Sequence, residues 1–167
     1  MARPTWTIRP VAERDAGAVA ELLAEVAREG RFIATEWPFD VEASAHAMRD
    51  AILERRVVGW VAADGRAIVG DLIVRDVADA EPELGMLVRA THRGRGIGAA
   101  LMSAARAWAL VNAKTALLLR VFPDNENAIA LYRANGFVDV ELQRRSVPRR
   151  DGSAWDALVM RCEIAKR

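Results

Sequence analysis

"HRGRGIGAALM", residues 92–102, places three glycines and two arginines directly before apolar residues with helical spacing. The strand-like segment "ELGMLV" (83–88) comes just before it. The first turn of a helix has backbone N–H groups without partners, and its dipole favours negative charge. Glycines let a ligand approach the backbone closely and permit positive φ. The stretch therefore predicts a phosphate-binding turn between a strand and a helix.

Three phosphate ligands compete for this turn. A nucleoside triphosphate loop ends in Gly-Lys-Ser/Thr, and the chain contains no Gly-Lys pair. A dinucleotide turn is closer, because Gly94, Gly96 and Ala99 satisfy G-x-G-x-x-A. That fold also needs an acidic residue about 20 positions later to hold the ribose. No Asp or Glu occurs between Gly94 and Pro123, which disfavours a nicotinamide cofactor. The third ligand is the pyrophosphate of coenzyme A.

Two motifs resemble those of the GNAT N-acetyltransferase superfamily, whose Q/R-x-x-G-x-G/A signature binds this pyrophosphate. The matching residues are Arg93, Gly94, Arg95, Gly96, Ile97 and Gly98. Val88 matches the valine that usually ends the family's fourth strand. The segment "NENAIALYRANGF" (125–137) is similar to the family's N-x-x-A-x-x-L-Y-x-x-x-G-F. The resemblance covers nearly the whole chain and is strongest from 83 to 137.

The pattern of the chain predicts a mixed α/β fold in the order β-α-α-β-β-β-α-β-α-β-β. Strands are expected at 5–11, 57–63, 67–74, 83–88, 115–121, 137–142 and 154–164. Helices are expected at about 13–29, after Asp40, after Gly96 and after Asp124 or Asn125. Segment 83–121 should form a right-handed parallel crossover in a largely antiparallel sheet. The resemblance implies the same order, with the fourth and fifth strands splayed apart.

Length and composition indicate one domain, residues 1–167, in three parts: 5–82, 83–121 for coenzyme A, and 122–167. Lys and Arg total 24 and Asp and Glu total 23, which argues against a general nucleic-acid or membrane-surface binder. The single Cys162 and the two histidines, His46 and His92, do not form a metal-binding pattern, so no metal is expected. Without a signal peptide or a long apolar run, the expected compartment is the cytoplasm.

The resemblance implies direct transfer of acetyl from acetyl-CoA to a primary amine, so the chain is expected to be an acyltransferase enzyme. Tyr132 lies where the family places its general acid, which protonates the departing thiolate. A backbone N–H of the fourth strand, at Leu87 or Val88, would hold the oxyanion. Gly85 could mark a bulge that produces the splay, or be an ordinary strand glycine.

Glu83, at the start of the fourth strand, is the candidate base, directly or through water, and the alternative is a solvated carboxylate. Glu81, Glu36 and Asp71 are less favoured substitutes. Asn125 can cap its helix, contact coenzyme A, or do both.

The resemblance implies that the acceptor binds near the loop that joins the first two helices, residues 30–40. Loop 30–40 carries Phe32, Trp37 and Phe39, which either line an apolar pocket or cover the core or a dimer surface. The basic segment 144–150 is expected to be a solvated loop between the last strands, and the alternative is that it attracts a carboxylate or the 3′-phosphate of coenzyme A. Trp155, which follows it, could close the cleft or pack on a partner subunit. A small-molecule amine is favoured over a protein or peptide amine, and a homodimer is a candidate assembly. The alternative from another class is a non-catalytic acyl-CoA-binding or regulatory module.

Overall fold

The computed structural model describes residues 5–164, which form one seven-stranded sheet with strand order β1-β2-β3-β4-β5-β7-β6. The strands are β1 (Trp6–Pro10), β2 (Val58–Asp64), β3 (Ala67–Arg75), β4 (Glu83–Val88), β5 (Ala116–Val121), β6 (Val138–Pro148) and β7 (Ala154–Glu163). The helices are α1 (Ala16–Ala27), α2 (Val41–Leu53), α3 (Ile97–Val111) and α4 (Glu126–Ala134), with short 3-10 turns at Glu13–Asp15 and Ala90–His92. The expected element order is confirmed.

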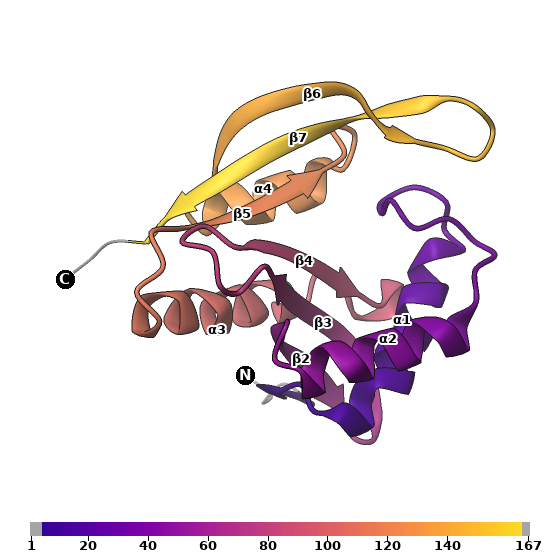
Figure 1. Cartoon of the computed structure of the whole chain (residues 1–167), viewed down its shortest axis with the longest axis vertical. Helices are drawn as coiled ribbons and strands as arrows, with labels where there is room; N and C mark the ends of the chain where they lie inside the picture. The colour runs from indigo at the N-terminus through magenta and orange to yellow at the C-terminus, as the bar shows by residue number, and fades with distance from the viewer. Residues whose placement is uncertain (1–4, 165–167) are drawn as a thin grey trace.

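The parallel pair β4 and β5 is held together at only one end. Their register contains the single pair Glu83 and Leu118, and the Leu118 N–H donates to the Pro82 carbonyl oxygen at 3.0 Å. Beyond this point β5 turns to its antiparallel partner β7, while β4 stays paired with β3. The two strands therefore diverge, as Figure 1 shows, and the expected splay is confirmed.

The expectation of a bulge at Gly85 is wrong. The register between β3 and β4 runs without interruption from the pair Gly70 and Val88 to the pair Arg75 and Glu83. A Cβ atom on Gly85 would lie 3.2 Å from Arg75 Nη1, so the glycine leaves room for this guanidinium. The splay arises from the lost pairing with β5 and not from a distortion of β4.

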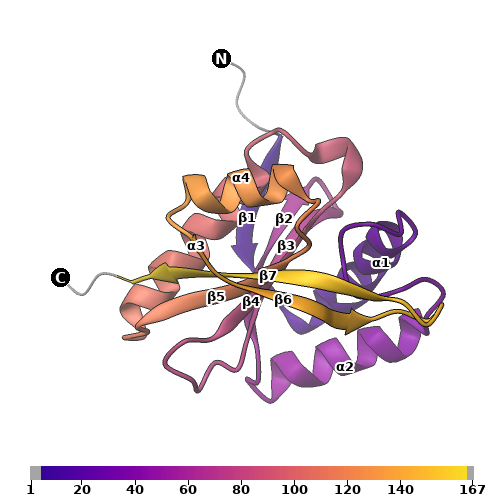
Figure 2. The ribbon, with the colours of Figure 1, turned by 90° about the horizontal axis from the view of Figure 1, so that it is seen from above.

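Helices α1 and α2 lie on one side of the sheet, and α3 and α4 lie on the other (Figure 2). Val61 of β2 packs with Val19, Leu22 and Val26 of α1 in one apolar cluster, which Leu87 of β4 also contacts. Strand residues alternate between faces. A Cβ on Gly70 would meet Ile97 of α3, so the next residue of β3 faces α1.

The basic segment 144–150 is exposed over most of its length, as expected, but most of it belongs to a strand and not to a loop. β6 continues to Pro148, with its pairing to β7 interrupted between Gln143 and Val147. The Arg145 N–H donates to Asp156 Oδ1 at 2.7 Å across this irregularity. Long, paired strands carry the segment because its turn comes later, at the expected Asp151-Gly152, where Gly152 has φ 85°.

Asn125, and not Asp124, caps α4. Its Oδ1 accepts the Ala128 N–H at 3.3 Å, and the helix ends before Gly136, whose φ is 88°. A side-chain cap satisfies one of the backbone donors that the first helical turn leaves without a partner. The cap therefore helps to fix the helix that carries Tyr132.

Replacement of the cap tests this assignment. Asn125→Ala should lower the free energy of unfolding by about 1 kcal/mol, because one backbone donor loses its partner. Asp124→Ala, at the exposed position just before it, should change stability by less than about 0.5 kcal/mol. Urea denaturation of both variants gives the comparison, and equal losses would contradict the assignment.

Candidate active site

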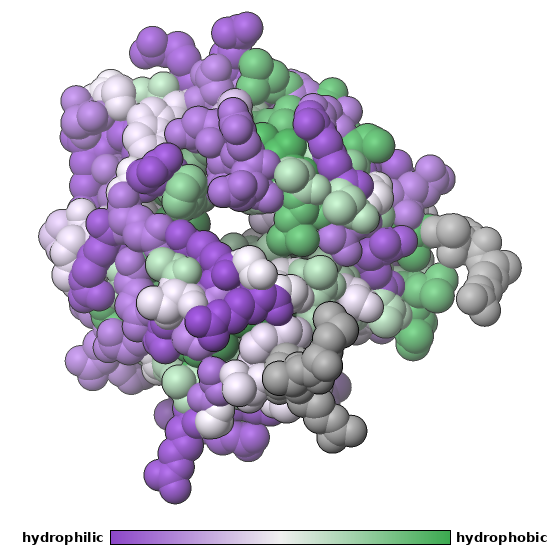
Figure 3. Space-filling view, turned by 180° about the vertical axis from the view of Figure 1, so that it is seen from behind, coloured by the Kyte–Doolittle hydropathy of each residue, from purple (hydrophilic) through white to green (hydrophobic). Residues whose placement is uncertain are grey.

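A cavity of about 860 Å³ follows the separation of β4 from β5. One half is lined by the first turn of α3, with Gly98, and by α4, with Leu131 and Tyr132. The other half is lined by α1, the loop after it and the α1-facing side of β3 and β4. Figure 3 shows the opening near the centre of the molecule. The open edge of β4 thus connects two differently built halves, which are called the α3 half and the α1 half below.

The glycine turn leads into the α3 half. Gly94 and Gly96 have φ values of 72° and 81°, a region that L side chains rarely adopt. The first helical bond runs from the Ala100 N–H to the Gly96 carbonyl oxygen. The N–H groups of residues 97–99 therefore lack partners inside the helix. A Cβ on Gly98 would come within 2.6 Å of Leu131 Cδ2, so this glycine lets the Leu131 side chain of α4 pack directly on the first turn of α3.

The two arginines of the turn have different surroundings. Arg93 forms two hydrogen bonds to Glu29, at 2.8 and 2.6 Å, and its Nε donates to the Val88 carbonyl oxygen at 3.0 Å. Its charge is thus matched by a carboxylate, and it connects the turn after α1 to the end of β4. Arg95 is exposed and has no ion pair among the described residues. Of the two, Arg95 keeps its charge available to an anion.

The backbone of β4 presents donors toward its open edge. The Arg89 N–H bonds to Val69 of β3, and the alternation of an antiparallel ladder directs the Leu87 N–H toward β3 as well. The Val88 carbonyl, in contrast, faces the open side, where it meets Arg93. The N–H groups of Val88 and Met86 share that direction. The Val88 N–H therefore fits the role of oxyanion donor, and the Leu87 N–H does not. The Met86 N–H is a second candidate that the sequence analysis did not name, although its position two residues before Val88 places it on the same edge.

Tyr132 projects from α4 into the α3 half of the cavity. The residue is 6% exposed, and its ring packs on Phe137 with centroids 5.9 Å apart. Its hydroxyl has no hydrogen-bond partner in the part of the chain that the structure describes. Burial raises the pKa of Tyr132 to about 12. The phenol is consequently protonated at neutral pH and can act as a donor.

The four carboxylates proposed from the sequence are not equivalent. Glu83 lines the cavity, is about a third exposed, and forms an ion pair with Arg120 at 3.2 Å. Glu81 pairs with Arg161 outside the cavity. Glu36 also lies outside and accepts the Arg150 N–H. Asp71 does line the cavity.

Among residues 5–164, Asp71 alone contributes a buried carboxyl group to the α1 half. The residue is 3% exposed, and its Oδ2 is enclosed without a hydrogen-bond partner in residues 5–164. Its register neighbours on β2 and β4 are Val61 and Leu87, both apolar. Burial raises the pKa of Asp71 to about 7, and the positive charge of Arg75 opposes this only in part.

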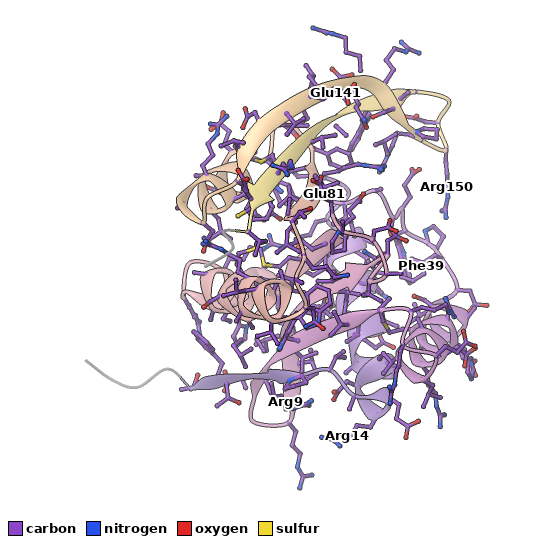
Figure 4. The ribbon with its side chains drawn as sticks, turned by 60° about the vertical axis from the view of Figure 1, so that its left-hand side comes forward. Arg9, Arg14, Phe39, Glu81, Glu141 and Arg150 are labelled. Atoms are coloured by element: carbon purple, nitrogen blue, oxygen red, sulfur yellow. The ribbon has the colours of Figure 1, made fainter. Side chains whose placement is uncertain are left out.

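Arg149 joins the β6–β7 hairpin to the loop between α1 and α2. Its side chain is 6% exposed, donates to the Ala34 carbonyl oxygen at 3.0 Å, and lies 4.0 Å from the Trp155 ring centroid. Arg150 donates to the Pro38 carbonyl oxygen at 2.7 Å, and Figure 4 shows it near Phe39. The hairpin and the loop therefore meet beside the α1 half of the cavity.

The three aromatic residues of the loop between α1 and α2 have different surroundings. Phe32 lines the cavity. Trp37 and Phe39 do not, and pack edge to face on each other at 5.9 Å. Trp37 is 41% exposed, with the Arg28 guanidinium over its ring. Trp155 packs on Phe122.

Residues 55–139, just over half of the chain, match the family model described as acetyltransferase (GNAT) domain. The chain belongs to the GNAT acetyltransferase family. No curated protein matches it in sequence. Its GNAT fold is shared by solved structures of low sequence identity. The acetyltransferase yncA of Salmonella typhimurium, solved with acetyl-CoA, is 18% identical, with a TM-score of 0.83 and coverage of 98% of this chain and 96% of that one.

Two further solved structures show the same fold. A phosphinothricin acetyltransferase from Sinorhizobium meliloti, solved in complex with acetyl-CoA, is 22% identical, with a TM-score of 0.81 and coverage of 97% and 90% of the two chains. A ribosomal-protein-alanine N-acetyltransferase from Brucella melitensis is 22% identical, with a TM-score of 0.81 and coverage of 94% and 99%. The shared fold is thus found with named acceptors of very different size.

The α3 half fits the acyl donor of a GNAT enzyme. It combines unpaired N–H groups at a helix start, a glycine turn that lets a ligand approach the backbone, and the open edge of β4. Within residues 5–164 no cluster of three or more metal-ligating side chains occurs. In the same range no helix is both long and apolar enough to span a membrane.

Asp71 should make stability depend on pH. Its carboxyl stays protonated in the folded chain to about pH 7 but ionises near pH 4 in the unfolded chain. The folded state therefore binds more protons between these values, and stability falls as pH rises through this window. Asp71→Asn should remove up to about 4 kcal/mol of this fall. Urea denaturation between pH 4 and pH 8 measures it, and parallel curves for both proteins would contradict it.

Proposed function

We propose that this GNAT chain transfers the acetyl group of acetyl-CoA directly to the primary amine of a small molecule. One observation carries the proposal: the unpaired edge of β4, the glycine turn before α3 and Tyr132 all line one cavity. Acyl transfer needs donors for an oxyanion and an acid for the leaving group. Both kinds of group line the same cavity.

The donor would be held by the α3 half. Gly94, Gly96 and the first-turn N–H groups of α3, at Ile97, Gly98 and Ala99, suit the pyrophosphate of coenzyme A. Arg95 adds positive charge at the turn, and Arg93 keeps the end of β4 in place through Glu29. Asn125 lines the cavity while it caps α4, which is compatible with a contact to the donor.

The chemistry forms a bond between the amine nitrogen and the acetyl carbonyl carbon and breaks the bond from that carbon to sulfur. The N–H of Met86 or Val88 would donate to the carbonyl oxygen as negative charge develops on it. Tyr132 would give its proton to the leaving sulfur. Glu83 would accept the proton that the amine loses, directly or through water, and release it to solvent.

The α1 half would receive the acceptor. The loop that Arg149 and Arg150 hold against the β6–β7 hairpin adjoins this half, which suits a small amine better than a protein chain. The similar solved structures do not distinguish a small acceptor from a protein acceptor, because one is named for phosphinothricin and another for a ribosomal protein. The sequence-based expectation is a cytoplasmic homodimer. An apolar contact for such a dimer could be formed by three exposed residues of β6, namely Val138, Val140 and Leu142.

Tyr132→Phe tests the acid. The turnover number should fall by about a hundredfold, because the sulfur leaves without a proton, while the affinity for acetyl-CoA changes little. Release of the coenzyme A thiol across a panel of amines measures the first quantity, and calorimetric titration measures the second. Unchanged turnover would remove Tyr132 from the role. Binding of acetyl-CoA without acetylation of any amine would favour the non-catalytic module.

Glu83→Gln tests the base, with Glu81→Gln as its matched control. Both glutamates are partly exposed and paired with an arginine, but only Glu83 lines the cavity. Glu83→Gln should lower turnover at least about tenfold, with the largest loss below the pKa of the amine. Glu81→Gln should leave turnover within about twofold of the unchanged protein. Equal effects of the two substitutions would contradict the assignment.

A further inference from the structure

The floor of the α1 half is a patch of the β3–β4 ladder. Asp71 is opposite Leu87, Ile73 is opposite Gly85, and Arg75 is opposite Glu83. Directly opposed residues share a face, so these side chains all point toward the side of α1 and α2. The patch therefore has a carboxyl group at each end.

Asp71 is nearer than Glu83 to the open-edge donors. It lies one strand across from Leu87, so its Cα is about 6 Å from that of Met86, if strands are 4.8 Å apart and residues 3.3 Å. Glu83 lies three residues along β4, which is about 10 Å. Asp71 is thus the carboxyl closer to the place where an amine would meet the acetyl carbonyl.

No contact within the described chain accounts for the burial of Asp71. Its Oδ2 is enclosed and unpartnered, and its neighbours Val61 and Leu87 belong to the apolar cluster beneath α1. A buried carboxyl without a partner weakens a fold. Groups of this kind are concentrated at functional sites. Because Asp71 lines the cavity, a ligand that enters the α1 half can approach its carboxyl group.

The other groups around this half define what that ligand is. Helices α1 and α2 contribute only uncharged side chains to the cavity, namely Val19, Leu23, Val26 and Met48. The charged groups of the sheet there are Arg75, Glu83 and Arg120, with Glu83 and Arg120 paired. His92 and Arg93 lie at the glycine turn, paired with Asp64 and Glu29. Among the described residues this leaves Arg75 and Asp71 without an ion pair, and of these two only Asp71 can bind a cation, whose apolar body would meet the side chains of α1 and α2.

We propose that Asp71 is a specificity-determining residue whose carboxylate binds the amino group of the acceptor and so selects alkylammonium-type amines with an apolar body. The inference rests on the proposed acetyl transfer and deepens it. Asp71 holds the ammonium group beside the open edge of β4, and Glu83 remains the carboxylate through which the proton reaches solvent.

Binding of n-butylammonium to the full chain saturated with coenzyme A tests the proposal without any turnover. Calorimetry or protein NMR at pH 8 should show affinity at least tenfold weaker in Asp71→Asn than in the unchanged chain. Asp50→Asn, at an exposed position of α2, is the matched control and should bind normally. Neutral n-butanol should bind all three alike. Equal ammonium binding by Asp71→Asn would overturn the proposal.

Two further measurements keep the test decisive if Asp71→Asn folds poorly. Asp71→Leu fills the same apolar surroundings, so it should fold at least as stably and still bind n-butylammonium at least tenfold more weakly. In the unchanged chain, affinity for n-butylammonium should fall about tenfold from pH 8 to pH 6, as Asp71 becomes protonated. A pH-independent affinity would overturn the proposal.

Kinetics separate this inference from the proposed function. With any amine that is acetylated, Asp71→Asn should raise the acceptor KM at least tenfold and change the acetyl-CoA KM by less than twofold. Glu83→Gln should instead lower kcat. Ammonium binding that needs Asp71, without acetylation of any amine, would remove the proposed function and retain the subsite. Acetylation with an unchanged acceptor KM in Asp71→Asn would retain the proposed function and remove the ammonium subsite at Asp71.

Discussion

The structure depends on the single backbone pair between Glu83 and Leu118, after which β4 and β5 part. Paired along its whole length, β4 would have no donors left for a ligand, because both of its edges would be satisfied. One-sided pairing keeps β4 rigid through β3 and leaves the N–H groups of Met86 and Val88 facing a cavity. A cleft between parallel strands is thereby built without a distorted strand.

The same strand also separates the two halves of the site by its alternation. One set of β4 side chains faces α3 and α4, where the donor would be held, and the other faces α1, where Asp71 and Glu83 lie. The two carboxyls differ because their surroundings differ. Glu83 is partly exposed to solvent and forms an ion pair with Arg120. Asp71 is buried beside Val61 and Leu87, and this burial raises its pKa to about 7. One ladder therefore carries an exposed and a buried carboxyl group on the same face.

Much of this could be predicted from the sequence, because the glycine turn, the apolar periods and the Asn125–Phe137 segment are local signals. Element order and the strand bounds of β4 were confirmed. Two features depend on partners that the sequence pattern does not reveal: Gly85 makes room for Arg75 instead of forming a bulge, and Arg149 is buried against Trp155. Asp71 ranked low for the same reason, since its isolation depends on β2, β4 and α1 packing around it.

Residue-resolved amide hydrogen exchange, with and without acetyl-CoA, tests the open-edge arrangement most directly. The account predicts that acetyl-CoA slows exchange at Met86 and Val88 and in the first turn of α3. Exchange at Leu87 and Arg89, already directed toward β3, should change far less. Slowing confined to Leu87 and Arg89, or absent from β4 altogether, would contradict it.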